Sequence, residues 1–494
     1  MPIIPQKKPA KNLKFQILHG LSWSGSAQII RQLVQFITTV ILARILNPHD
    51  FGLVSMVTVF SGFGTLFGDF GLGSALIQRK EITKEQINSV FWFNIFMGVF
   101  LTSLFIGCAP IISKFYHQPQ LMLITVVISF IFIINSFSIV QKALLQKNMQ
   151  FKIIALCDIF SIGIASIFGI SMAYKSYGVW SLVSFYLLQI LFNAILIWFL
   201  AKWKPGFNFN FRALRDLFSF SMNLIGFNAI NYWSRNLDSL LIGKFLGTNQ
   251  VGFYARAYNL MMLPMTQVLV FLTQVMFPVL SSIQDDKNRA KAVYLNATRM
   301  IALFTFPLMI GLFVVSEPFI LAIYGEKWHP VVPILRLLCL VGMLQSVGST
   351  VGWIYNSQAR TDIQLKWGII NAIILFISFI IGLRWGVLGV AGAYAIANYG
   401  ILWVPSWIIP LKLLNIRFFE MLNNLKGIFF CSIIMGALIK VISYIIPSNW
   451  PAWLTLIMCT VFGCAIYGSL LLLFKTQALQ EVLLIISDVR NKKR

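Results

Sequence analysis

The stretch QIIRQLVQFITTVILARIL, residues 28–46, is aliphatic enough for a membrane-spanning helix and contains neither proline nor glycine. It nevertheless carries Arg31, near the middle of the longer apolar segment 15–46. An arginine at the centre of a bilayer span costs about 2.5–3.5 kcal/mol on insertion scales. A charge placed at such a cost predicts a role inside the membrane.

The whole chain has the composition of a polytopic membrane protein. Of its 494 residues, 58% are hydrophobic and 11% are charged, and the mean hydropathy is +0.80. A soluble chain of this length would carry about 25% charged residues. Apolar stretches of membrane-spanning length recur along the chain, and no polar stretch is long enough to form a soluble domain.

The hydrophobic pattern predicts an all-α protein with about fourteen transmembrane helices. Several spans exceed the roughly 20 residues that a bilayer requires, which allows tilt or extension beyond the hydrocarbon. The expected spans are 17–46, 51–77, 87–113, 120–146, 152–174, 178–201, 217–246, 251–281, 292–322, 331–357, 363–383, 386–411, 427–447 and 452–474.

The positive charges fix the expected orientation of these spans. Alternate connections, together with the two termini, hold 27 of the 39 lysines and arginines, whereas the seven opposite connections hold one each. Positive residues stay on the cytoplasmic side of a membrane. We therefore expect basic cytoplasmic tails at 1–14 and 475–494. The net charge of +24 is explained by topology and by contact with anionic membrane lipid, so nucleic acid is not expected as a partner.

The cysteines and histidines predict neither a metal site nor a disulfide framework. The six cysteines are scattered, mostly within apolar spans, and the four histidines are isolated. The loops contain no acid pair, nucleophile motif or metal cluster. We therefore expect a protein that is not an enzyme, with no catalytic residues and no bound cofactor.

The first part of the chain resembles the second. LARILNPHDFGL (42–53) aligns with IGKFLGTNQVGF (242–253), PIISKFY (110–116) with PFILAIY (318–324), and YGVW (177–180) with WGVL (385–388). Three matches in order at nearly one offset indicate duplication. Six helices separate the copies, which predicts two parallel six-helix bundles, 15–204 and 205–411, around a central cleft. Residues 412–474 add two transmembrane helices outside the repeat.

Polar residues recur at matched positions of the first and seventh helices. They are Gln28, Arg31, Gln35 and Thr38, with Gln32 beside them, and, 200 residues later, Asn228, Asn231, Arg235 and Asp238. The spacing places each set on one helical face. One interpretation is that these groups join helices by hydrogen bonds, with Arg235 and Asp238 neutralising one another. The other, which we prefer because Arg31 has no acid within reach in its own helix, is a water-filled cleft that receives an anion. Arg256 either lines the outward mouth of this cleft or anchors the membrane interface.

Several segments resemble one family of transporters. RQLVQFITTVILARILNPHDFGLVSM and DFGLGSALIQRKEIT in the first half, and LDSLLIGKFLGTNQVGFYARAYNLMMLP, VMFPVLSSIQDD and YGEKWHPVVPIL in the second, are similar to the polysaccharide transporter family. That family lies within the multidrug/oligosaccharidyl-lipid/polysaccharide exporter superfamily. The most similar branch is the Wzx-like exporter of the colanic-acid and teichuronic-acid type, and the resemblance covers roughly residues 15–410.

The resemblance implies a flippase of the bacterial inner membrane that works by alternating access. Its cargo would be an oligosaccharide linked to undecaprenyl pyrophosphate, and polysaccharide polymerase or export machinery would be possible partners. In this interpretation, arginines hold the pyrophosphate, amides bind sugar hydroxyls, and an acid couples transport to a proton or sodium ion. The corresponding residues are Arg31, Arg235 and Arg256 for pyrophosphate, Gln28, Gln32, Gln35, Asn228 and Asn231 for sugar, and Asp238 for the ion.

Three alternatives stay open at this point. A lipid II flippase of the same fold has a matching helix count. A multidrug extruder would favour carboxylates in its cleft, whereas the deep acids here are few: Asp238 and, less clearly, Asp69 and Asp158. A scaffold of a glycan synthesis complex, which transports nothing, would tolerate replacement of Arg31 and Arg235.

Overall fold

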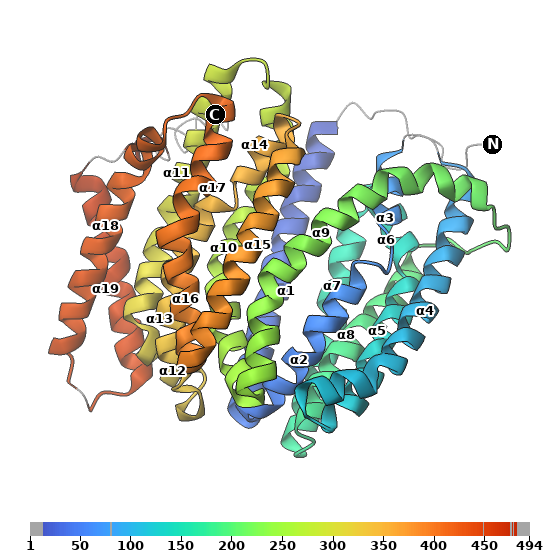
Figure 1. The fold of residues 1–494 in the computed structure, drawn as a ribbon, viewed down its shortest axis with the longest axis horizontal. Helices are drawn as coiled ribbons and strands as arrows, with labels where there is room; N and C mark the ends of the chain where they lie inside the picture. The colour runs from blue at the N-terminus through green and yellow to red at the C-terminus, as the bar shows by residue number, and fades with distance from the viewer. Residues whose placement is uncertain (1–12, 80–81, 448, 475–476, 478, 482–494) are drawn as a thin grey trace. The chain divides into compact units, whose positions relative to one another are not determined.

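The computed structural model describes residues 13–79, 82–447, 449–474, 477 and 479–481 (Figure 1). Every regular element among these residues is a helix, which confirms the expected all-α fold. The chain divides into two compact units, residues 1–252 (unit 1) and residues 253–494 (unit 2).

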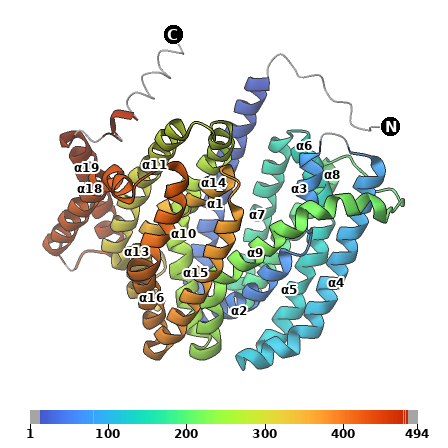
Figure 2. The same cartoon turned by 45° about the horizontal axis from the view of Figure 1, so that its top comes forward.

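Unit 1 is built from antiparallel helix pairs. Helix α4 packs along α5, α7 packs along α8, and α1 lies against α7 (Figures 1 and 2). The helices are α1 (Leu13–Ile45), α2 (Pro48–Thr65), α3 (Leu72–Gln78), α4 (Lys84–Tyr116), α5 (Gln120–Ser136), α6 (Ile139–Lys147), α7 (Phe151–Tyr174), α8 (Val179–Leu200) and α9 (Phe211–Leu246).

Unit 2 contains the remaining helices, and α10 (Thr248–Ser282) begins just before the division. Helix α11 packs against α13 and α18, and α18 lies beside α19 in both views. The other α-helices are α11 (Lys287–Val314), α12 (Ser316–Ile323), α13 (Val331–Gly348), α14 (Val351–Ser357), α15 (Thr361–Gly382), α16 (Gly386–Ile396), α17 (Trp403–Leu411), α18 (Phe418–Ile445) and α19 (Ala452–Leu473).

Within the described part of the chain, nine helices are long and apolar enough to cross a membrane, or ten if the bent pair α5 and α6 forms one span. One of them, Thr361–Leu414, is a 54-residue stretch that covers two of the expected spans. Three further expected spans are helical but are not among these nine. They are 51–77, which corresponds to α2 and α3, 217–246, which corresponds to α9, and 251–281, which corresponds to α10. The helical segments therefore follow the sequence pattern along the whole described chain.

Some expected spans are interrupted. The span 292–322 is divided at Val315, between α11 and α12, and two others are broken where the backbone turns or bends. The predicted helix 51–77 is interrupted after Thr65, because Phe70 (φ 49°) and Gly71 (φ 72°) adopt left-handed conformations. The predicted helix 120–146 bends by 41° between α5 and α6. The indole Nε1 of Trp198 donates a 2.6 Å hydrogen bond to the carbonyl oxygen of Phe137 at this bend, so the carbonyl exposed by the break is satisfied.

Turn conformations recur at the spacing of the sequence repeat. Helix α2 begins at Pro48 and α10 at Thr248, 200 residues later. The residues after the repeat-matched segments PIISKFY and PFILAIY, His117 and Gly325, both have positive φ, 56° and 88°. Gly178 and Gly386, again 208 residues apart, have φ of 57° and 72° and stand at the starts of α8 and α16.

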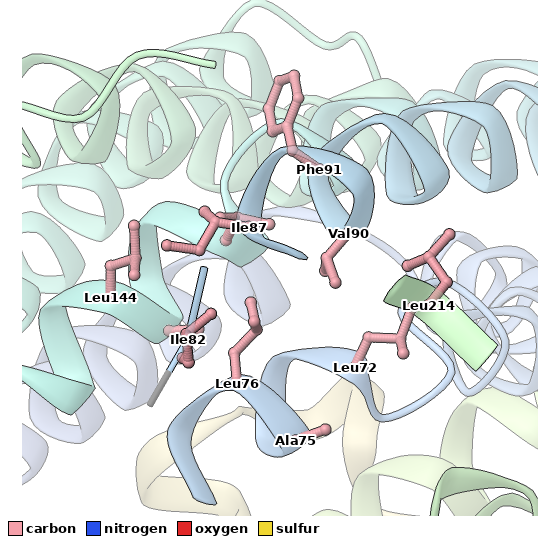
Figure 3. Packing of buried hydrophobic residues seen from close by; sticks show 11 residues of the cluster. Leu72, Ala75, Leu76, Ile82, Ile87, Val90, Phe91, Leu144 and Leu214 are labelled. Atoms are coloured by element: carbon pink, nitrogen blue, oxygen red, sulfur yellow. The ribbon is translucent and has the colours of Figure 1, made fainter. Parts of the chain in front are cut away.

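Packing groups α9 with unit 1, although the sequence repeat assigns this helix to the second copy. Helix α9 contacts α2, α3 and α4. Figure 3 shows one of these contacts, in which Leu214 of α9 is buried beside Leu72 of α3 and Val90 of α4. Division by packing and division by repeat therefore differ in the placement of α9.

Candidate functional site

The polar residues of α1 form a half-exposed group along one face of the helix. The guanidinium Nη2 of Arg31 donates a 2.9 Å hydrogen bond to Oε1 of Gln28, one turn earlier. Arg31, Gln28 and Gln32 are partly exposed, and Gln35 is exposed. Since a charged donor makes its strongest hydrogen bonds to anions, Arg31 remains able to bind an anionic group while Gln28 restricts its rotamer.

Thr38, the last of these polar residues on α1, packs against another helix. Its hydroxyl donates 2.7 Å to Oγ of Ser166 on α7, and its exposed fraction is 2%. Ser166 in turn donates 2.6 Å to the carbonyl oxygen of Ile162. The interpretation that these polar residues join helices by hydrogen bonds therefore applies to Thr38, whereas Gln35, one turn away, stays exposed.

The matched group on α9 also divides into exposed and buried members. Asn231 and Arg235 are exposed and Asn228 is partly buried, whereas Asp238 is 3% exposed. The backbone N–H of Ser239 donates 2.6 Å to Oδ1 of Asp238. Arg235 and Asp238 thus lie in different environments, although they are separated by three residues on one helix.

Aromatic side chains hold α9 against α2 and leave its polar face free. The hydroxyl of Tyr232 donates 2.7 Å to the carbonyl oxygen of Val59 on α2. The Trp233 ring lies 5.1 Å from that of Phe63, centroid to centroid. Because Tyr232 and Trp233 pack on α2, the face that carries Asn231 and Arg235 is not occupied by this contact.

All the predicted cleft residues except Arg256 belong to unit 1. Within the described residues, no hydrogen bond joins the α1 group (Gln28, Arg31, Gln32 and Gln35) to Asn228, Asn231 or Arg235. The two groups are held on separate supports, α1 by α7 and α9 by α2, α3 and α4. Their joint contact with a cargo stays a prediction.

Arg256 occupies an aromatic environment in unit 2. Its guanidinium carbon lies 5.7 Å from the ring centroid of Tyr324 and 5.6 Å from that of Trp328. The exposed fraction of Arg256 is 9%. Cation–π contact with two rings stabilises a buried arginine, so packing is the role that this geometry supports directly, and contact with substrate stays a prediction.

Unit 2 also contains a feature that the sequence did not predict, an apolar cavity of about 980 Å³ beside α18. Residues of α18 at helical spacing, from Leu422 to Lys440, form one wall. Helices α11, α13 and α17 contribute the others. Apolar residues of α18 are spread around the whole helix, so its hydrophobic pattern could not single out the face that lines a cavity. The sequence feature that could have pointed to this face is the pair Lys426 and Lys440, which are four helical turns apart and therefore lie on the same side of α18.

Metal-binding chemistry finds no support in the described residues. No group of three or more histidine, cysteine, aspartate or glutamate side chains there is arranged to hold a metal ion.

A smaller polar cluster lies in unit 1, where Nδ2 of Asn193 donates 2.8 Å to Oδ1 of Asp158 and the Lys142 ammonium is 4.0 Å from the same oxygen.

Comparison with known proteins identifies the family. The profile of a family described as polysaccharide biosynthesis protein matches residues 41–333, more than half of the chain. The chain is 31% identical to the teichuronic acid biosynthesis protein TuaB of Bacillus subtilis (strain 168), over 81% of this chain and 84% of the relative. It is 25% identical to the succinoglycan biosynthesis transport protein ExoT of Rhizobium meliloti (strain 1021), over 96% of both chains.

Among solved structures, the fold is similar to the lipid II flippase MurJ in an inward closed conformation. The TM-score is 0.74 at 18% sequence identity, and the match covers 91% of this chain and 98% of MurJ. This likeness shows the fold of a lipid flippase, and the sequence matches supply the family. The chain therefore belongs to the polysaccharide biosynthesis protein family and is a Wzx-like, multi-pass membrane flippase rather than an enzyme.

Proposed function

We propose that this protein moves an oligosaccharide linked to undecaprenyl pyrophosphate from the cytoplasmic to the periplasmic leaflet of a bacterial inner membrane by alternating access. The observation that carries this proposal is the placement of Arg31 and Arg235, exposed or half-exposed, among the polar residues of two repeat-related helices, α1 and α9. Intramembrane cations of this kind mark the pathway of a charged cargo.

The chemistry of the cargo matches these side chains. A pyrophosphate diester carries about two negative charges, and neither it nor the attached sugars cross hydrocarbon unaided. Guanidinium groups bind phosphate oxygens through paired donors, which suits Arg31 and Arg235. The amides of Gln28, Gln32, Gln35, Asn228 and Asn231 are donors and acceptors for sugar hydroxyls.

An apolar cavity in unit 2 supports a lipid-linked cargo. Its wall on α18 extends from Leu422 to Lys440, 18 steps along the helix and a length of about 27 Å at 1.5 Å per residue. This length is close to the roughly 30 Å of the bilayer hydrocarbon. An extended prenyl chain would fit along it while the headgroup is carried elsewhere.

The driving force has two candidate sources. An inside-negative potential of about 100 mV favours outward movement of two negative charges by roughly 4–5 kcal/mol. Coupling to an inward proton or sodium ion would add to this, and the buried carboxylate of Asp238 is the residue that we assign to it. Arg256 would act near the outer mouth, and both termini would lie in the cytoplasm.

Deletion of the gene, followed by analysis of accumulated lipid-linked sugars, tests the proposal. Accumulation of one undecaprenyl-linked repeat unit on the cytoplasmic side identifies the cargo and the flippase activity together. Accumulation of lipid II would support that cargo instead. Normal polymer yield with Arg31→Ala and Arg235→Ala would favour a scaffold, and loss of drug resistance alone would favour a multidrug extruder.

A further inference from the structure

A second cavity, of about 930 Å³, lies on another side of α18, between this helix, α11 and the residues Phe474 and Gln477. We propose that this cavity binds one anionic phospholipid of the cytoplasmic leaflet, which is not transported. The residues on which the proposal depends are Arg299, Asn423, Asn424, Lys426, Phe430 and Ile434.

The lining changes from polar to apolar along α18, as a phospholipid does along its length. Asn423, Asn424 and Lys426 lie in the first turns of the helix, at the end that the charge pattern places in the cytoplasm. Phe430, Cys431 and Ile434 follow deeper in the span. Eight residues separate Lys426 from Ile434, about 12 Å of helix, and one leaflet contributes about 15 Å of hydrocarbon. The cavity therefore has polar lining at the depth of a lipid headgroup and apolar lining at the depth of its acyl chains.

Hydrogen bonds hold the polar end of the cavity in place. Nε of Arg299 donates 2.9 Å to Oδ1 of Asn424, and Nη1 donates 2.5 Å to Oε1 of Glu481. Nδ2 of Asn424 donates 2.9 Å to the carbonyl oxygen of Leu295 on α11. The exposed fraction of Arg299 is only 9%. Because α11 and α18 are fixed together here, the cavity is preformed for a ligand.

The charges around the cavity leave one cation for a phosphate. Glu420 forms an ion pair with Lys291, at 2.7 Å, and Glu481 forms one with Arg299. Lys426 lines the cavity and is exposed, and in the described part of the chain it forms no ion pair. Among the described residues that line the cavity, this leaves one surplus positive charge beside Asn423, which suits one phosphodiester. Phe430, 60% exposed, leaves the apolar end open to lipid.

The chain offers matched variants that separate this cavity from its surroundings. Ile434→Trp places an indole in this cavity, and Ala437→Trp places the same group in the apolar cavity, since each residue lines one cavity alone. Lys426→Gln removes the proposed phosphate partner, and because Lys426 lines both cavities, Ala437→Trp is the variant that shows whether the apolar cavity contributes. Lys412→Gln removes an exposed cytoplasmic charge that lines neither cavity.

Native mass spectrometry of the full-length protein, released from micelles that contain phosphatidylglycerol or phosphatidylcholine, tests the proposal. We expect the wild type to retain one phosphatidylglycerol preferentially. Lys426→Gln should lower this occupancy by about fivefold, the factor that corresponds to about 1 kcal/mol per lysine near a membrane surface. Ile434→Trp should abolish it, whereas Lys412→Gln and Ala437→Trp should leave it unchanged.

Three results would overturn the proposal. Equal losses in Lys426→Gln and Lys412→Gln would mean that general surface charge retains the lipid. Undiminished binding to monodisperse Ile434→Trp protein would place the lipid elsewhere. Displacement of the lipid by glycerol 3-phosphate at equal concentration would mean that the site recognises a free anion. Because the readout is lipid binding, failure here leaves the transport proposal untouched.

Discussion

Gly52 and Gly252 occupy the fifth positions of two repeat-related helices, and each lies against the first residue of the other helix. A Cβ atom on Gly52 would collide with the carbonyl oxygen of Thr248, and one on Gly252 would collide with the carbonyl oxygen of Pro48. Pro48 and Thr248 are themselves 200 residues apart. The contact is therefore reciprocal, with the internal symmetry of the repeat, and its closeness requires residues without a side chain.

Alanine at either glycine should destabilise the protein. In a helix, Gly→Ala ordinarily stabilises by about 0.5–1 kcal/mol, but here the added methyl group meets a backbone carbonyl that cannot move alone, and overpacking typically costs about 1–3 kcal/mol. We expect Gly52→Ala and Gly252→Ala to lower the thermal unfolding temperature of the purified protein. Gly163→Ala is the control, since its Cβ would meet nothing within 4 Å on α7, and it should be neutral or stabilising. Equal Tm values for all three variants would show that the contact is not tight.

Loss of a cleft arginine should reduce transport without removing the protein from the membrane. A hydrogen bond to a charged group contributes about 1.5–3 kcal/mol, so Arg31→Ala and Arg235→Ala should each slow flipping by roughly one to two orders of magnitude. Flipping of labelled lipid-linked sugar in proteoliposomes measures this directly. Arg384→Ala, at an exposed arginine in an outer connection, should retain full activity. Wild-type rates for both cleft variants would contradict the anion site.

Exposure along α1 should be visible to a thiol reagent. In a cysteine-free background, Gln35→Cys and Asn231→Cys should react with a membrane-impermeant maleimide, because both positions are exposed and the proposed cleft would bring water to them. Thr38→Cys should not, since Thr38 is 2% exposed against α7. Labelling yield by gel shift or intact mass gives the answer. A reactive Thr38→Cys together with inert Gln35→Cys would reverse our assignment of the two faces.

Both chain ends should report a cytoplasmic position. A green fluorescent protein fused after Arg494 should fluoresce, whereas alkaline phosphatase at the same place should be inactive. The same reporters inserted after Lys175, in a connection with a single positive charge, should give the opposite pattern. Fluorescence at both positions would overturn the orientation that we derive from the charge distribution.

The sequence predicted the helices better than it predicted their surroundings. The period of apolar residues placed α1, α9 and α10 close to their observed positions, and the 200-residue offset related the starts of α2 and α10, because these signals are local or repeat along the chain. The break after Thr65 was missed, since its cause is the left-handed backbone of Phe70 and Gly71 within an apolar run.

Side-chain environments depended on partners distant in the chain. Gln35 and Thr38 share a helical face, but only Thr38 meets a polar partner, Ser166, which is 128 residues away. The aromatic rings around Arg256 come from Tyr324 and Trp328 on other elements. Both cavities beside α18 arise from the spacing between helices, which no single helix encodes.

The placement of α9 has a consequence for how such a chain arose and how it can be divided. The predicted repeat places its sequence in the second copy, yet its packing contacts lie with the first. The two predicted repeat copies therefore do not coincide with the two compact units. Fragments separated at the repeat boundary near residue 205 would each lack contacts that the other holds, whereas fragments separated after residue 252 would keep α9 with its neighbours.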